Sequence, residues 1–436
     1  MYGSCMRDPV SVGPGRPGDI YRRLGVEPIV NGRSTFTILG GSLMPSEVLG
    51  AMHEAAGAFV DLVELQEAIG RRLAELTRNE AAFVSGGAAA GLFLSAAACM
   101  ARRTRDGVLQ LDELDAYPRE FVIHRAHRVP YDAVIELAGG TLVEFGPEPG
   151  KAPRGGPGRK TRRELGSLLT ARTAAIVYVP KPHLTGDVLP LPAVIEAAGH
   201  HGVPVIVDAA AQLPPRENLW RFTQQGASLA LFSGGKGLRG PASTGLIVGG
   251  SDWIRRVAAN AAPLHRPGRP MKAGKEDLIG LLAAVEWYLA QDEAELDRRY
   301  EAVVDHFVRW GRNRGDVTVD RVPYGEAGQP TPRAHIRLTT SSPSERDAFL
   351  AALRATPPRI DLLSDEGADQ AAEDAGFYVA PETLQPGEEV VIVERLETEL
   401  ARFRGACLPA AARRGHAPMI NGAQTTTEPA SVGGST

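Results

Sequence analysis

Cysteine is scarce in this sequence: its 436 residues include only Cys5, Cys99 and Cys407, which lie far apart. They have none of the paired spacings that indicate a disulfide framework or a zinc site. Long apolar runs are absent as well, so no segment reaches the length of a membrane span, and the N-terminus lacks the apolar core of a signal peptide. We therefore expect a soluble cytoplasmic protein without a metal site or a membrane partner.

An excess of charge of one sign is also missing. Lys and Arg together number 48, Asp and Glu number 52, and the net charge at pH 7 is −4. Because proteins that bind nucleic acid over much of their surface are strongly basic, we expect no nucleic-acid partner. The chain is long enough to bury a sizeable core and to form one large and one small domain.

The most informative stretch is Ser233-Gly-Gly-Lys236-Gly-Leu-Arg-Gly-Pro241, which lies between two apolar runs that are typical of buried strands. Its glycines free the backbone and leave room for a flat ligand. A lysine between buried strands is costly unless its charge is neutralised or used. A Schiff base with an aldehyde cofactor does both. From this stretch alone, a strand-end lysine that reaches solvent is an equally good interpretation.

A second apolar run, Val203-Pro-Val-Ile-Val-Asp208, ends in a carboxylate. The distance to Lys236 leaves room for a helical crossover between two neighbouring strands. An aspartate there could keep a pyridine nitrogen protonated, which makes the ring of pyridoxal 5′-phosphate (PLP) an electron sink. Aspartates at strand ends also serve as helix caps or as metal or ribose ligands, so it is the combination with Lys236 that favours the cofactor.

A third feature is the small-residue turn Ser85-Gly86-Gly87-Ala88, between a predicted strand from Glu80 and an alanine-rich helix to Met100. Backbone amides at such a helix start form an anion site, helped by the helix dipole. Neither a GxGxxG nor a GK[ST] pattern is present, so a dinucleotide fingerprint and a P-loop are both excluded. Tight packing of the helix on a sheet explains the small residues equally well.

Strand and helix patterns alternate through the first two thirds of the chain, which predicts the α/β class with a doubly wound, mostly parallel sheet. Ligands of such sheets lie beyond the carboxyl ends of the strands. The turns at Ser85, His127, Thr185, Asp208 and Lys236 all follow predicted strands. After these, the pattern predicts one long helix over residues 276–312 and then a small α+β domain.

The predicted domain organisation has six parts. They are a disordered lead (1–20), an N-terminal arm (21–45), a PLP-binding large domain (46–262), an interdomain segment (263–275), a small C-terminal domain (276–405) and a disordered tail (406–436).

Over roughly residues 20–405 the chain resembles fold-type I PLP enzymes of the selenocysteine synthase-like branch, and within it the D-glucosaminate-6-phosphate ammonia-lyase-like proteins. The resemblance rests on a set of short motifs: Ile29-Val-Asn31-Gly, Leu39-Gly-Gly-Ser42, Ser85-Gly-Gly-Ala-Ala-Ala90, Asp208-Ala-Ala-Ala211, the Ser233–Pro241 stretch, and Gly268-Arg269-Pro-Met-Lys272-Ala-Gly-Lys275. Each motif is weak alone, and together they are specific.

The resemblance implies a role for each cofactor-binding position. Lys236 forms the Schiff base and Asp208 pairs with the pyridine nitrogen. The turn that includes Ser85, Gly86, Gly87 and Ala88 holds the cofactor phosphate, to which Ser233 adds a hydroxyl.

Further positions follow from the same resemblance. His127 is placed to stack on the ring, with a surface histidine as the alternative, and Thr185 lies near the ring hydroxyl, with a turn cap as the alternative. Arg269, Lys272 and Lys275 match positions that meet the substrate's phosphate or other anion. A solvated basic linker is the competing interpretation of these three cations.

The expected function is that of a PLP-dependent lyase on a small, anionic amino acid or amino sugar acid. Lys236 takes the α-proton, a group leaves from the β-carbon, and ammonia is released. A racemase, aldolase or transaminase could use the same site, and a catalytically silent PLP-fold binding protein is the non-enzyme alternative. A selenocysteine synthase-like transferase is a weaker alternative, because no tRNA-binding domain precedes Asn31. The expected partners are a small-molecule substrate and further copies of the chain, as a homodimer or larger.

Overall fold

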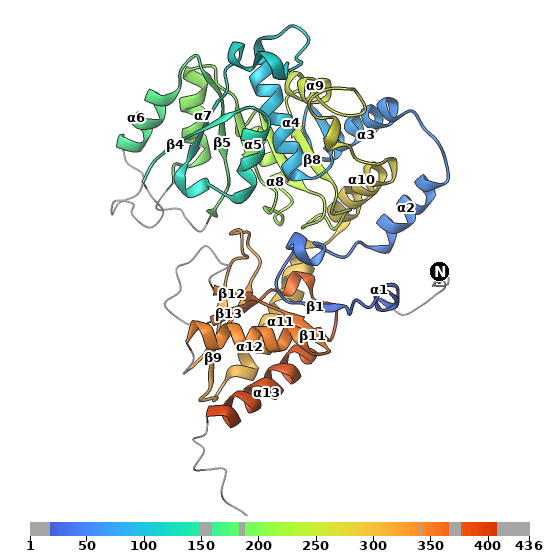
Figure 1. Ribbon diagram of the computed structural model, residues 1–436, viewed down its shortest axis with the longest axis vertical. Coiled ribbons are helices and arrows are strands. Elements are labelled where there is room, and N and C mark those ends of the chain that lie inside the picture. Colours follow the sequence, from blue (N-terminus) through green and yellow to red (C-terminus); the bar gives the residue numbers. More distant parts are fainter. Residues whose placement is uncertain (1–17, 148–158, 183–187, 340–341, 366–375, 408–436) are drawn as a thin grey trace, which may run out of the picture.

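A computed structural model describes residues 18–147, 159–182, 188–339, 342–365 and 376–407. Figure 1 shows two parts of the molecule, one built around a large sheet and a smaller one formed by the C-terminal part of the chain. Within the described ranges, no helix combines the length and the apolar composition needed to cross a membrane.

The large sheet has seven strands, and its central strands are parallel. Strand β8 alone runs antiparallel to its neighbours β2 and β7. Every residue of β5 is buried, as expected for a parallel sheet that is covered on both faces. The strands in sheet order are β2 (Ala81–Ser85), β8 (Gly245–Gly249), β7 (Leu229–Ser233), β6 (Val205–Asp208), β5 (Thr173–Tyr178), β3 (Glu120–His124) and β4 (Thr141–Phe145). The predicted α/β fold is therefore confirmed.

Helices cover both faces of this sheet, and alternate strand residues face opposite cores because side chains alternate along a strand. Val207 of β6 belongs to one core and Ile206 to the other. The first core is closed by α3 (Leu62–Leu76), α6 (Arg159–Leu168), α7 (Leu191–His200), α8 (Asn218–Gln224) and α10 (Lys275–Ala290). The second is closed by α4 (Ala88–Met100), α5 (Ala133–Leu137) and α9 (Ser251–Ala259).

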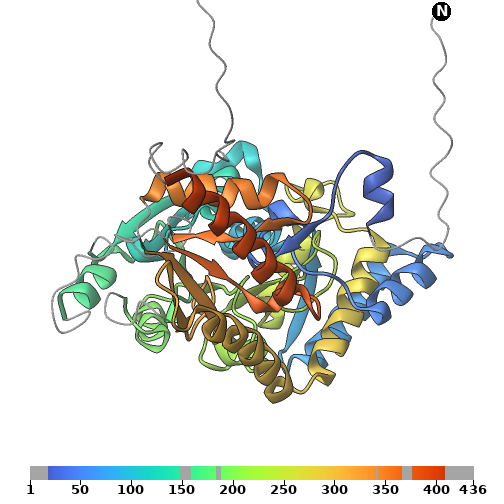
Figure 2. The same cartoon turned by 90° about the horizontal axis from the view of Figure 1, so that it is seen from below.

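The C-terminal part has its own core under a four-stranded antiparallel sheet. Figure 2 views this part from below, with the red helix α13 crossing the near side. The strands in sheet order are β12 (Leu363–Ser364), β13 (Gly376–Val379), β10 (Arg333–Leu338) and β9 (Val317–Val322), and the helices are α11 (Glu293–Gly311), α12 (Pro343–Ala355) and α13 (Glu388–Cys407).

The N-terminal arm is attached to this C-terminal part. Strand β1 (Ile29–Asn31) pairs in parallel with β11 (Arg359–Asp361), which places the Asn31 motif on the small core. The rest of the arm comprises α1 (Asp19–Arg23) and a 3-10 turn (Thr37–Leu39), and it leads to α2 (Ser46–Ala56), which packs on α10.

The prediction of one long helix over residues 276–312 is wrong. The chain forms α10 and α11 instead, because Gln291 and Asp292 have extended backbone conformations. The Asp292 carboxylate caps α11 by accepting hydrogen bonds from the amides of Ala294 and Glu295, at 2.9 and 3.2 Å. This start signal interrupts an otherwise continuous helical pattern, since aspartate is a preferred N-cap residue.

Candidate active site

Asp208 and Lys236 lie at the same edge of the large sheet. Asp208 is the last residue of β6 and is in register with Leu231 of the neighbouring strand β7, which ends at Ser233 and leads into the lysine turn. Burial raises the pKa of the Asp208 carboxyl, whereas the Ala210 amide, which donates to Oδ1 at 3.1 Å, and the charge of Lys236 oppose the rise. The predicted pair is thus brought together in one site.

The turn that carries Lys236 is built from close backbone approaches. The amide of Gly234 donates to the carbonyl of Thr244 at 2.8 Å, and the amide of Gly240 donates to that of Gly234 at 2.7 Å. A Cβ atom on Gly237 would lie 2.6 Å from the carbonyl oxygen of Leu213. Side chains at these positions would force the backbone apart, so the glycines fix the course of the turn around Lys236.

The turn after β2 forms the start of α4. Gly87 has a φ of +119°, a conformation that favours glycine, and it is the N-cap of the helix. The first amides of a helix have no partner within it, so those of Ala88 and Ala89 are donors for an anion. The hydroxyl of Ser85 is buried and hydrogen bonds to the carbonyl oxygens of Gly87 and Gly245 at 2.8 and 3.2 Å, so it fastens the turn to the sheet.

His127 follows β3 and is almost fully buried. Its ring packs edge-on against Tyr178, with the ring centroids 4.5 Å apart. Burial lowers the pKa of His127 to about 3, with smaller effects from His124 and Lys181. Among the described residues, nothing forms a hydrogen bond with the buried Nε2 of His127. The imidazole is therefore neutral, with one polar atom available to a ligand.

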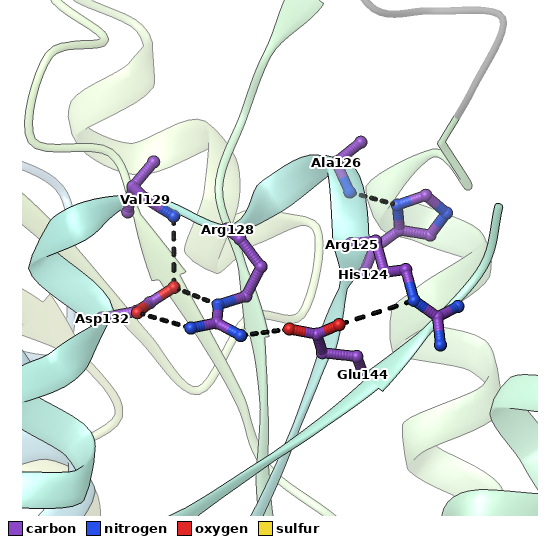
Figure 3. A network of polar contacts seen from close by, with 7 residues as sticks. All are labelled: His124, Arg125, Ala126, Arg128, Val129, Asp132 and Glu144. Carbon is purple, nitrogen blue, oxygen red and sulfur yellow. Dashed lines mark hydrogen bonds and ion pairs between the residues drawn. The ribbon is translucent and has the colours of Figure 1, made fainter. Parts of the chain in front are cut away.

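A polar network holds the turn after β3, and Figure 3 shows Arg128, Asp132 and Glu144 at its centre. Arg128 donates to both oxygens of Asp132, at 2.6 and 3.2 Å, and also pairs with Glu144 of β4. The Asp132 carboxylate further accepts from the Val129 amide at 3.1 Å. These bonds link the turn after β3 to the neighbouring strand, which fixes the position of His127.

Ser233 and Thr185 are the two remaining predicted cofactor residues. Ser233 is half-buried at the end of β7, beside the lysine turn. Thr185 lies outside the described residues, so its predicted place near a ring hydroxyl stays a prediction.

The three predicted anion-binding cations do not converge within one chain. Arg269 and Lys272 line a separate hollow next to the Ser85 turn, where the amide of Gly86 donates to the carbonyl of Met271 at 3.0 Å. Among the described residues, no carboxylate forms an ion pair with either cation. Lys275, in contrast, donates to the carbonyl of Ala55 at 2.6 Å and to Glu276 at 2.5 Å.

The cavity that contains Lys236 is also lined by residues that the sequence patterns did not indicate. It has about 50 Å³ of free volume and lies where the large sheet meets the arm and the C-terminal part. These lining residues include Thr35, Asp297, Thr331 and Glu382. Three of the short motifs also reach this cavity, since Ser42, Ala211 and Arg239 line it. The turn formed by the Asn31 motif contacts Glu382 through Ser34.

These features fit PLP. The amides at the start of α4 suit a phosphate group, and a protonated pyridine nitrogen suits Asp208, because a nearby positive charge favours the ionised form of a buried carboxyl. The unpartnered Nε2 of His127 lies in the turn after β3, at the same edge of the sheet. Lys236 follows the strand next to that of Asp208, so both residues can reach one ring-sized ligand.

Comparison with known proteins agrees with this geometry. The chain matches the aminotransferase class-V family over residues 47–272. It is 34% identical over 88% of its length to the 5′-C-glycyluridine monooxygenase-decarboxylase of a Streptomyces species, covering 93% of that protein. It is 30% identical over 87% of its length to the D-glucosaminate-6-phosphate ammonia lyase of Salmonella typhimurium, covering 97% of it.

A solved structure of D-glucosaminate-6-phosphate ammonia-lyase superposes on this chain with a TM-score of 0.72 and 28% identity, over 88% of this chain and 98% of the other. The predicted resemblance to ammonia-lyase-like proteins is thus confirmed, as is the prediction of an enzyme. The chain belongs to the aminotransferase class-V family, and its cofactor is pyridoxal 5′-phosphate.

Proposed function

We propose that this protein is a PLP-dependent lyase that acts on a small, anionic amino acid or amino sugar acid and releases ammonia. One observation carries the proposal: Asp208 ends one strand of the sheet, the turn of Lys236 follows the neighbouring strand, and Lys236 lines a cavity together with residues of the C-terminal part. The relationship to an ammonia lyase over nearly the whole chain supports the type of reaction.

When bound, the cofactor supplies an electron sink for the carbanion that forms at the substrate's α-carbon. Asp208 would accept a hydrogen bond from the ring nitrogen and would keep that nitrogen protonated. The Nζ atom of Lys236 takes the α-proton as a general base. The amides of Ala88 and Ala89 would hold the phosphate, and the uncharged imidazole of His127 would contact the ring. A β-hydroxyl or similar group then leaves with the bonding electron pair, and the proton held by Lys236 converts a departing hydroxyl into water. The released enamine tautomerises to an imine, which water hydrolyses to ammonia and a keto acid.

We further propose that the site is completed in a homo-oligomer. Arg269 and Lys272 lie away from the Lys236 cavity of their own chain, and no ion pair with a described residue occupies them. In a dimer or larger assembly, this segment can reach the pocket of a neighbouring subunit. There the two cations bind an anionic group of the substrate through charge-assisted hydrogen bonds.

Borohydride reduction followed by peptide mapping tests the role of Lys236. The cofactor is expected on Lys236 in the wild type and on no residue in Lys236→Ala, which keeps its fold because glycines and strands hold the turn. Lys272→Ala is the matched control, and it should retain the attachment. Cofactor trapped on another lysine, or on none, would remove the basis of the proposal.

A screen of amino acids and amino sugar acids then tests the reaction, read by keto acid and ammonia release. A second candidate reaction has one specific observation in its favour, since the relative with 34% identity is named a monooxygenase-decarboxylase. The screen therefore also records carbon dioxide release and oxygen uptake. Release of carbon dioxide with uptake of oxygen, and without formation of a keto acid, would favour the second reaction.

A further inference from the structure

Glu382 lies in the wall of the Lys236 cavity, on the side formed by the C-terminal part. It is the middle residue of a short 3-10 helix, Pro381–Thr383. Its Oε1 atom accepts a hydrogen bond from the hydroxyl of Ser34 at 2.5 Å. Its Oε2 atom is buried and forms no hydrogen bond with any described residue. A buried polar atom without a partner is costly, and this one has a neighbouring cavity from which a partner can come.

The arm holds Glu382 in this position. Ser34 has a φ of 91°, which is unusual for a residue with a side chain, and its carbonyl accepts from Asn31 Nδ2 at 3.1 Å. The hydroxyl of Thr383 donates to the carbonyl of Asn31 at 2.7 Å. Strained backbone of this kind is kept where the surrounding contacts enforce it, often at ligand sites. The Asn31 turn thus fixes the carboxyl of Glu382 from two sides.

The charges around the cavity do not favour a phosphate at this wall. Glu293 is paired with Arg216, at 3.0 Å. Apart from that pair, the lining has two cations, Lys236 and Arg239, and two carboxyls, Asp297 and Glu382. The two carboxyls offset the two cations, so this lining has no excess of positive charge with which to hold a dianion.

Uncharged hydrogen-bonding groups make up much of the same wall. Thr35 comes from the arm, and Gln329 and Thr331 precede β10. The free volume of about 50 Å³ has room for a few water-sized groups, which suits the end of a hydroxylated chain. Burial raises the pKa of Glu382, opposed by its hydrogen bond with Ser34. A hydroxyl can donate to the ionised carboxylate or accept from the protonated acid, so it fits either state.

We propose that Glu382 determines substrate specificity by hydrogen bonding, through Oε2, to a hydroxyl group of the substrate beyond its β-carbon. The substrate is then a polyhydroxylated amino acid, of the amino sugar acid class. This inference rests on the proposed function, because it assumes that an amino acid binds beside Lys236. The hydroxyl groups of the substrate then bind to the wall of the cavity, and any anionic group binds to Arg269 and Lys272.

The test uses the holoenzyme and two probes that differ only in their hydroxyls. D-glucosaminate and D-2-aminohexanoate have the same six-carbon chain and the same amino acid end. Each is titrated while the absorbance band of the cofactor is followed. We expect the wild type to bind D-glucosaminate about tenfold more tightly, and Glu382→Leu to lose that preference without weaker binding of D-2-aminohexanoate.

Two further variants keep the test decisive. Glu382→Gln retains an acceptor for the Ser34 hydroxyl, so this variant should fold. The affinity of Glu382→Gln for D-glucosaminate should fall roughly two- to tenfold. Glu394→Gln removes a carboxyl from the exposed side of α13 and should behave like the wild type. Equal affinities for the two probes in the wild type, or an unchanged preference in both Glu382 variants, would overturn the inference.

The outcomes separate this inference from the proposed function. Should neither probe shift the cofactor band, amino acids do not bind beside Lys236 and the proposed function itself fails. Should both probes shift it equally, only the role of Glu382 is lost. D-lysine serves as a cationic probe, and tighter binding of D-lysine than of D-glucosaminate would show that the carboxyl recognises an amine instead of a hydroxyl.

Discussion

The amide and the hydroxyl of Ser42 both donate hydrogen bonds to the carbonyl oxygen of Gly235, at 2.9 and 3.0 Å. Gly235 directly precedes Lys236, so the N-terminal arm touches the lysine turn from outside the large sheet. Gly41, which precedes Ser42, packs so closely that a Cβ atom on it would lie 2.5 Å from the carbonyl oxygen of Gly235. The arm therefore helps to set the position of Lys236, the proposed Schiff-base lysine.

Gly41→Ala should disturb this contact. The new methyl group would clash with the Gly235 carbonyl, and the φ of +78° at Gly41 is unfavourable for alanine. Gly40→Ala is a matched control, because Gly40 has a φ of +90° and a Cβ atom added there would have nothing within 4 Å. We expect lower cofactor occupancy and a lower melting temperature for Gly41→Ala than for Gly40→Ala. Equal effects of the two changes would mean that backbone strain alone matters here.

Asp208→Asn should keep PLP bound and lose most of the turnover. A neutral partner no longer holds the ring nitrogen protonated, and loss of such an electrostatic contact costs on the order of 10²–10³ in rate. The measurement is kcat for the best substrate, with the cofactor content checked by absorbance. Near-normal activity would assign Asp208 a structural role, such as capping the turn through the Ala210 amide.

Arg269→Ala should weaken substrate binding by about 1.5–3 kcal/mol, the scale of a hydrogen bond to a charged group, while cofactor affinity is kept. Inorganic phosphate should compete with the substrate, and less effectively at high salt. Lys275→Ala gives the contrast, since Lys275 already bonds to Ala55 and Glu276, and its loss should lower stability more than affinity. A best substrate without a second anionic group, together with no response to Arg269→Ala, would favour the solvated-linker interpretation.

The buried His127 should make stability depend on pH. Its pKa is about 3 in the folded chain, lowered by burial, against about 6.5 when exposed. Between these values the unfolded chain binds more protons, so stability is full above about pH 6.5 and is lost as the pH falls toward 3. With the cofactor removed, the melting temperature of His127→Phe should therefore fall less steeply between about pH 7 and pH 5 than that of the wild type. The exposed His201→Gln is the control, and an unchanged slope in His127→Phe would contradict the assignment.

The sequence alone was enough to predict that Asp208, the Lys236 turn and the Ser85 turn are placed at strand ends of the large sheet. Asp208 and Lys236 each follow an apolar run that is long enough for one buried strand, and parallel strands bring their carboxyl ends to a common edge. The Ser85 turn was visible for the same reason, because its small residues lie between a strand and a helix start. These signals are local, so each could be interpreted without knowledge of the rest of the chain.

Long-range packing decided the rest. The hydrogen bond between Ser34 and Glu382 joins residues 348 positions apart, and neither residue lies in a periodic segment. Lys275 lies in a basic segment that is typical of an anion site, yet Ala55 and Glu276 already bind its ammonium group. Local sequence patterns indicate which residues end a strand or begin a turn. Which side chains from the arm and the C-terminal part meet at the Lys236 cavity depends on the packing of separate elements against one another, and only the tertiary structure contains that information.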